Sequence, residues 1–97
     1  MKLTLCSVGN PDFGQYAPPS PRIIAEVASF EEASHQVRAY IAAHDLGGGN
    51  WSRQSGILRD RGKVVGCVSY NGRVWPPGAM DAPTLPDPLY DPRKALP

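Results

Sequence analysis

Runs of apolar and polar residues alternate between two turn signals within residues 47–75, and this pattern predicts three antiparallel strands. Asn71-Gly72 is expected to form a two-residue type I′ loop, because Asn and Gly both tolerate positive φ. Tyr70 would then face Arg73 across the loop. The earlier turn is predicted at Asp60-Arg61-Gly62, whose glycine suits the left-handed position of a short loop or bulge. The segment is therefore expected to be a β-meander.

Two further strands are predicted before this meander. Residues 2–8 alternate polar and apolar side chains, with Leu3 and Leu5 on one face of the strand. Residues 22–28 carry several β-branched side chains directly before a helix start, which is typical of a strand. A long proline-rich loop over residues 10–21 separates the two strands and excludes regular structure there.

The helix has the most distinctive start signal in the chain. Ser29 and Glu32 form an S-x-x-E capping box, in which each side chain satisfies a free backbone donor. We expect the helix over residues 30–46, ended by Gly47 as a left-handed cap. Its apolar stripe, which would pack on the sheet, consists of Phe30, Ala33, Val37, Tyr40, Ile41 and His44.

The segment after the meander is rich in proline and cannot fold independently. Residues 79–97 are either disordered or extended over the domain, with Met80, Leu85, Leu89 and Tyr90 as docking side chains. The expected organisation is one compact domain over residues 1–78 followed by this tail. The expected fold class is α+β, with one helix packed on a mainly antiparallel sheet of four or five strands in the order β-(β)-α-β-β-β.

Composition indicates a small soluble, cytoplasmic domain. The 97 residues are 41% hydrophobic and 20% charged with a net charge of +1, so no overall field directs the chain to nucleic acid or to an anionic membrane. No apolar run reaches the roughly 18 residues of a membrane span, and the apolar start is too short for a signal peptide. Cys6 and Cys67 fall in predicted strands, where free thiols are favoured over a disulfide.

No pattern in the chain predicts catalysis, a metal or a cofactor. His35 and His44 lie on opposite faces of the predicted helix, and the two cysteines lack zinc-site spacing. The glycine run at residues 47–50 follows the helix, whereas phosphate-binding loops precede one. No G-x-S-x-G elbow accompanies the serines. The chain is therefore expected to be no enzyme and to bind no cofactor.

A local excess of basic residues is the main functional signal. Residues 53–73 contain one acid, Asp60, among several Lys and Arg side chains. Three interpretations stay open: a solvated sheet face on which Tyr70 stacks with Arg73, a protein-binding surface, and a nucleic-acid surface with Trp51, Tyr70 and Trp75 as stacking platforms. Protein binding is preferred to nucleic acid because the glycine-aromatic RNP1 pattern is missing. The candidate partner-binding residues are Phe13, Tyr16, Trp51, Arg53, Arg59, Arg61, Lys63, Tyr70 and Arg73.

At the segments GGGNW and VSYNGRVW, which begin and end residues 47–75, the chain resembles small uncharacterised proteins of proteobacterial genomes and mobile elements. In size and character it also resembles phage-borne anti-CRISPR proteins, which inhibit by occluding functional surfaces of nucleoprotein effector complexes. The resemblance implies a non-enzymatic interaction module that binds a protein or nucleoprotein partner. It assigns a role to no individual residue and leaves the oligomeric state open.

Overall fold

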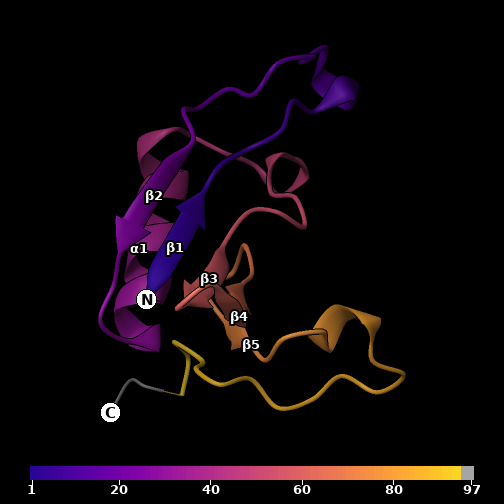
Figure 1. Cartoon of the computed structure of the whole chain (residues 1–97). Coiled ribbons are helices and arrows are strands. Elements are labelled where there is room, and N and C mark those ends of the chain that lie inside the picture. Colours follow the sequence, from indigo (N-terminus) through magenta and orange to yellow (C-terminus); the bar gives the residue numbers. More distant parts are fainter. Residues whose placement is uncertain (95–97) are drawn as a thin grey trace.

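The computed structural model describes residues 1–94 and has one helix packed on a five-stranded antiparallel sheet (Figure 1). The predicted α+β fold class is confirmed. The strands follow the spatial order β2-β1-β3-β4-β5, so that β1 lies between β2 and β3. The elements are β1 (Lys2–Leu5), β2 (Ile23–Glu26), α1 (Phe30–Ala43), β3 (Ile57–Asp60), β4 (Lys63–Val68) and β5 (Val74–Trp75), with short 3-10 turns η1 (Pro11–Phe13), η2 (Gly48–Asn50) and η3 (Ala79–Asp81).

Helix α1 covers one face of the sheet. Leu3 of β1 pairs in register with Ala25 of β2 and with Leu58 of β3, and both leucines are fully buried. Val37 and Ile41 on the inner side of α1 belong to the same buried cluster. Because side chains alternate along a strand, the neighbours of these residues point to the opposite face, in front of the sheet in Figure 1.

The helix begins where the capping signal predicts and ends earlier than expected. Ser29 Oγ accepts a hydrogen bond from the Glu32 N–H at 3.0 Å. At the other end Asp45 takes the left-handed conformation (φ 52°), and the Leu46 N–H donates to the Ile41 carbonyl at 3.0 Å. This is a Schellman motif. The prediction of Gly47 as the cap is wrong, because burial of Leu46 turns the chain two residues before it.

The two-residue hairpin loop lies at Arg61-Gly62. Asp60 pairs with Lys63, and both loop residues have positive φ (53° and 81°), as a type I′ turn requires. The predicted left-handed conformation of Gly62 is confirmed. The sequence predicted a turn at Asp60-Arg61-Gly62 but not its type I′ geometry, because arginine lacks the usual preference for the first loop position.

The turn between β4 and β5 is longer than predicted. The last strand pair is Val68 with Val74, and the Gly72 N–H donates to the Ser69 carbonyl at 2.9 Å. Gly72 has φ +86°, whereas Asn71 stays at negative φ. The expectation of a type I′ loop with Tyr70 facing Arg73 is therefore wrong. The Asn71 amide oxygen instead accepts from the Ser69 hydroxyl and the Arg73 N–H at 2.5 and 3.1 Å, which stabilises the longer loop.

Part of the C-terminal segment docks on the edge strand β5. The Val74 N–H donates to the Tyr90 carbonyl at 2.9 Å, and the Leu89 N–H donates to the Val74 carbonyl at 2.7 Å. Tyr90 packs against the core, while Leu85 stays 57% exposed. Of the two predicted states of the tail, disordered or extended over the domain, residues 89–91 adopt the extended one. Tyr90 is the docking side chain. Residues 95–97 of the expected tail lie outside the described part of the chain.

Candidate functional site: a basic groove over strand β1

The sheet face opposite α1 carries a row of charged side chains. Lys2 of β1 pairs with Glu26 of β2 on one side and with Arg59 of β3 on the other. Thr4 pairs with Ile24, whose side chain is 49% exposed. These residues share one face because side chains alternate along each strand. The face therefore has an apolar and hydroxyl floor with charges around it.

Three adjoining hollows form one groove along β1. The first, of about 490 Å³, lies near the β3–β4 turn, and two more of about 270 and 300 Å³ continue toward Ser52 and Gln54. Arg22 lines all three hollows, which therefore adjoin one another, and we call them together the β1 groove. Its cationic lining residues are Lys2, Arg22, Arg59 and Arg61.

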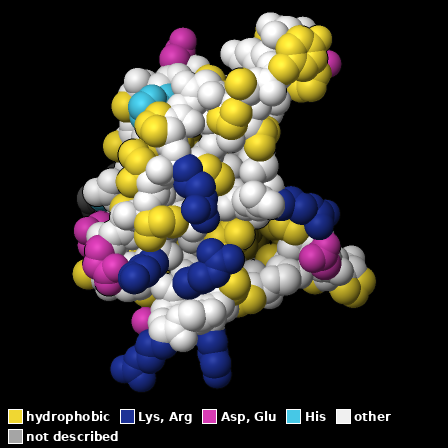
Figure 2. Space-filling view, turned by 45° about the horizontal axis from the view of Figure 1, so that its top comes forward, with side chains coloured by type: hydrophobic (Ala, Val, Ile, Leu, Met, Phe, Trp, Pro, Cys, Tyr) yellow, Lys and Arg dark blue, Asp and Glu magenta, His cyan; other side chains and the backbone are white. Residues whose placement is uncertain are grey.

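The four cationic side chains of the β1 groove have no ion-pair partner within residues 1–94. The ion pairs there join the Met1 ammonium to Glu26 and two arginines to aspartates elsewhere. Figure 2 shows Lys and Arg side chains gathered on a hollowed face of the molecule. Unpaired cations in a concave surface concentrate positive potential. The β1 groove is therefore suited to an acidic ligand.

The two ends of the β1 groove differ in chemistry. The end near the β3–β4 turn holds the cations together with the carboxyl groups of Glu26 and Asp60. The other end is lined by Ser7, Ser20 and Ser52, whose hydroxyls are hydrogen-bond donors and acceptors. Tyr40 of α1 fixes this end, because its hydroxyl bonds to Ser20 Oγ at 2.6 Å. The groove thus holds most of its charge at one end and hydroxyl groups, together with Arg22, at the other.

The other half of the same sheet face is apolar. A smaller hollow of about 210 Å³ lies over β4 and β5 beside residues 76–81. Its apolar lining includes Val64, Cys67, Trp75 and Met80. Val64 is 44% exposed and Met80 57% exposed. An apolar area thus lies beside the basic groove.

Only some of the predicted partner-binding residues lie together. Arg59 and Arg61 line the β1 groove, and Lys63 is exposed at the β3–β4 turn next to it. Arg53 forms an exposed ion pair with Asp81 at 3.5 Å, beside the apolar hollow. The chain positions these residues through the short β3–β4 hairpin and the loop before it.

Phe13 and Tyr16 lie on the loop between β1 and β2, which projects at the upper right in Figure 1, and are 80% and 88% exposed. Hydrogen bonds hold this loop in shape. The Asn50 side-chain amide donates to the Gln15 side chain and to the Val8 carbonyl, both at 2.9 Å. Asn50 thus connects this loop to the segment before β3.

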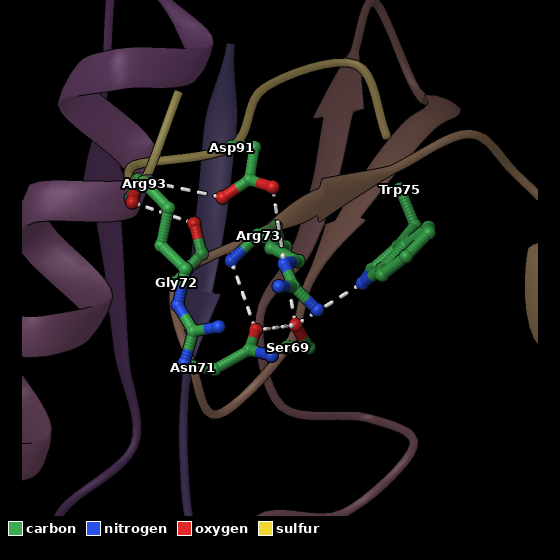
Figure 3. Close-up of polar contacts among 8 residues, drawn as sticks. Ser69, Asn71, Gly72, Arg73, Trp75, Asp91 and Arg93 are labelled. Carbon is green, nitrogen blue, oxygen red and sulfur yellow. Dashed lines mark hydrogen bonds and ion pairs between the residues drawn. The ribbon is translucent and has the colours of Figure 1, made fainter. Parts of the chain in front are cut away.

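The remaining predicted residues are engaged within the fold. The Trp51 indole N–H donates to the Val68 carbonyl at 3.0 Å, and the ring packs against the core. The Tyr70 hydroxyl donates to the Leu46 carbonyl at 3.0 Å. Arg73 pairs with Asp91 at 3.3 Å, as Figure 3 shows. Trp51 and Arg73, both predicted as partner-binding residues, thus already have partners within the fold.

Lys2 and Arg22 belong to the groove but were not among the predicted site residues. Alternation in β1 places Lys2 opposite Leu3 and Leu5, so its orientation toward the uncovered face was readable from the sequence. What the sequence does not reveal is the strand order. The position of β1 between β2 and β3 brings Lys2 and Arg22 next to Arg59.

The cysteines do not form a disulfide. The Cys6 thiol lies 3.6 Å from Ser55 Oγ, and Cys67 pairs with Ile57 from the other side of β3. The two cysteines lie on either side of β3, and two inter-strand spacings amount to roughly 9–10 Å. A disulfide tolerates a Cα separation of only about 7 Å. Burial raises the pKa of the Cys67 thiol. Within residues 1–94, no three His, Cys, Asp or Glu side chains gather closely enough to hold a metal ion.

Comparison with known protein families, curated proteins and solved structures finds no match to this chain. The functional argument therefore depends on the groove and its neighbouring surfaces. No helix within residues 1–94 has the length and apolar character needed to cross a membrane.

Proposed function

We propose that this protein is a non-enzymatic interaction module that docks an acidic segment of a partner protein in the β1 groove. The observation that carries the proposal is the set of unpaired cations, Lys2, Arg22, Arg59 and Arg61, over a concave and uncovered sheet face. Carboxylates of a partner would pair with these cations, and arginine favours bidentate pairing with a carboxylate.

Several features favour a protein partner over nucleic acid. The groove floor exposes aliphatic Ile24, whereas nucleic-acid strands are commonly held by stacking on aromatic rings. Trp75 is only 8% exposed, and Trp51 and Tyr70 donate hydrogen bonds within the fold. Glu26 and Asp60 on the groove wall repel any anion close to them, so the groove suits a ligand with a few carboxylates better than one with a charge on every unit. A partner with both acidic and apolar groups matches this combination better than a uniform polyanion.

The biological role that we propose is inhibition by occlusion. A small domain that covers an acidic functional surface of a bacterial nucleoprotein complex blocks access to it without catalysis. The support is the resemblance in size and character to mobile-element inhibitors, together with a binding face that occupies much of one side of a 97-residue chain. The direct nucleic-acid alternative uses the same cations and is separated from the protein-binding proposal by experiment.

The experiment is affinity capture from lysate of the native host with three versions of the protein. These are the wild type, an Arg59→Glu/Arg61→Glu variant of the groove, and a control Arg93→Glu/Lys94→Glu variant with the same change in net charge outside it. Nuclease treatment of the lysate removes partners bridged by nucleic acid. We expect the wild type and the control to capture the same proteins after nuclease treatment. The groove variant should fail to capture them.

Two results would count against the proposal. If all three versions capture the same proteins equally, the β1 groove is not the contact surface. If nuclease treatment removes every groove-dependent partner, the groove binds nucleic acid. Urea unfolding of each variant checks that the substitutions leave the fold intact, which is expected because Arg59 and Arg61 are exposed.

A further inference from the structure

Strand β2 leaves one edge of the sheet open. It pairs with β1 on one side, and it is the terminal strand of the order β2-β1-β3-β4-β5. The opposite terminal strand, β5, is covered by the bridge between Val74 and Tyr90. Ile23 and Ile24 of β2 are 42% and 49% exposed. An open strand edge is a template for pairing with another chain.

The register identifies which backbone groups point outward from β2. Met1 and Val27 exchange hydrogen bonds of 3.0 and 2.9 Å, which makes them a hydrogen-bonded pair of the antiparallel ladder. Such pairs alternate along the ladder, so Ala25 and Ile23 also bond to β1. The backbone groups of Ile24 and Glu26 therefore point away from the sheet. Within residues 1–94, no hydrogen bond from another segment reaches them.

The sequence of this edge is complementary to itself. Arg22 lies two residues before Ile24, and Glu26 lies two residues after it. When two copies of the edge run antiparallel about a two-fold axis at Ile24, Arg22 of each copy faces Glu26 of the other. Opposite charges directly across a strand pair are stabilising. Both side chains are exposed in the single chain.

We propose that two copies of this chain associate through their β2 edges about a two-fold axis at Ile24. The five-stranded sheets then join into one antiparallel sheet of ten strands. The two Ile24 residues form a hydrogen-bonded pair, and the two pairs of Arg22 with Glu26 flank it. The backbone can make this pairing, because the N–H and C=O groups of Ile24 and Glu26 point outward from the sheet.

The same geometry places two β1 grooves on one face of the joined sheet. Arg22 and Glu26 belong to the groove wall of each copy, so the two grooves meet at the two-fold axis. The Met1 ammonium lies 3.6 Å from the Glu26 carboxylate, whose side chain is still 72% exposed. Glu26 can therefore contact Met1 of its own chain and Arg22 of the other. Arg22 belongs to both proposals, whereas Arg59 and Arg61 take no part in the edge, so the Arg59→Glu/Arg61→Glu variant tests the groove without altering the β2 edge.

Sedimentation equilibrium over a range of concentrations tests the association. Short strand pairing buries little surface and gives a weak interface, so the range should reach about 1 mM protein. We expect the average mass to rise from the 10.5 kDa of one chain toward twice that value. A mass that stays at the single-chain value across the range would overturn the proposal.

Charge reversal tests the arrangement of the pair. Arg22→Glu or Glu26→Arg alone creates two like-charge contacts across the interface, and each should weaken dimerisation about fivefold or more. The double variant Arg22→Glu/Glu26→Arg exchanges the two charges and restores the pairing. A merely structural effect of either substitution would not be reversed by the second. Failure of the double variant to recover dimerisation rejects the two-fold register.

Amide hydrogen exchange supplies a readout that needs no substitution. In the single chain the Ala25 amide bonds to β1, whereas the Ile24 and Glu26 amides face solvent. We expect exchange at Ile24 and Glu26 to slow as protein concentration rises, while exchange at Ala25 changes much less. Dimerisation that leaves the Ile24 and Glu26 amides unprotected would show that a different surface joins the two copies.

Discussion

Arg73 and Asp91 connect the β4–β5 turn to the C-terminal segment. Arg73 Nε lies 3.3 Å from Asp91 Oδ2, and the Asp91 side chain is only 10% exposed. The other Asp91 oxygen accepts from the Arg93 N–H at 3.0 Å, and Figure 3 shows this carboxylate between the two segments. With the backbone bonds between Val74 and residues 89–90, the ion pair fixes the end of the chain along β5.

Removal of this segment should therefore destabilise the domain. We expect truncation after Gly78 to lower the free energy of unfolding by more than about 1 kcal/mol, since it exposes core area covered by Tyr90 and removes the bridge on the outer edge of β5. Urea unfolding of the truncated and full chains measures the difference. The full-length Leu85→Ser variant is the control, because Leu85 is 57% exposed and should matter little. Equal midpoints for the truncated and full chains would show that the docked segment contributes nothing.

The strong local signals in the sequence were sufficient to predict the helix and the strands. The Ser29 cap and the alternation of Leu3 and Leu5 each depend on residues within one turn or one strand, and the structure has both. The type of the β4–β5 turn could not be predicted from the Asn71-Gly72 pair alone. Asn71-Gly72 has the composition of a type I′ loop, yet side-chain bonds of Asn71 to Ser69 and Arg73 favour a longer loop.

The candidate site was predicted only in part, because it is assembled by strand order. Arg59 and Arg61 were identified from their position on a basic hairpin. Lys2 and Arg22 lie far from them in sequence and join them only because β1 pairs with β2 and β3 together. The hydrogen bond of the Trp51 indole could not be predicted either, because its acceptor, the Val68 carbonyl, lies in another element.

Replacing Arg61 with a residue that adopts its left-handed conformation more readily should stabilise the fold. Arg61 has φ 53° in the two-residue loop, and a left-handed backbone costs an ordinary residue roughly 1–2 kcal/mol, whereas asparagine adopts it more readily. We expect Arg61→Asn to raise the free energy of unfolding by up to about 1 kcal/mol. Thermal unfolding measures this, with Lys63→Asn after the loop as a control that gains nothing. A lower melting temperature for Arg61→Asn would contradict the turn assignment.

The Cys67 thiol should cause the free energy of unfolding to decrease at high pH. Burial raises the pKa of its thiol above the ordinary value of 9.0 in the folded chain, so the folded state holds this proton more tightly than the unfolded state. The resulting stabilisation is fully present below the unfolded pKa and is lost as pH rises through the folded pKa. We expect the unfolding free energy of the wild type to fall more steeply above pH 9.0 than that of Cys67→Ala.

Urea unfolding with a reductant, at neutral pH and above pH 9.0, measures both slopes. The Cys6→Ala variant retains Cys67 and should keep the steeper fall. Other groups titrate in the same range, and comparison among the three proteins removes their common contribution. Parallel pH profiles for the wild type and Cys67→Ala would show that the Cys67 thiol is not shielded from water.

The final prediction separates the two classes of partner. If the β1 groove contacts phosphates, each contacting cation contributes roughly 0.7–0.9 to the slope of log affinity against log salt concentration. Trp75 is buried and Trp51 and Tyr70 are hydrogen-bonded within the fold, so these three rings offer bases no free stacking surface. We therefore expect no electrophoretic shift of single- or double-stranded oligonucleotides at micromolar protein and about 50 mM salt, a condition that favours electrostatic binding. A clear shift that Arg59→Glu/Arg61→Glu abolishes and Arg93→Glu/Lys94→Glu retains would make nucleic acid the ligand of the groove.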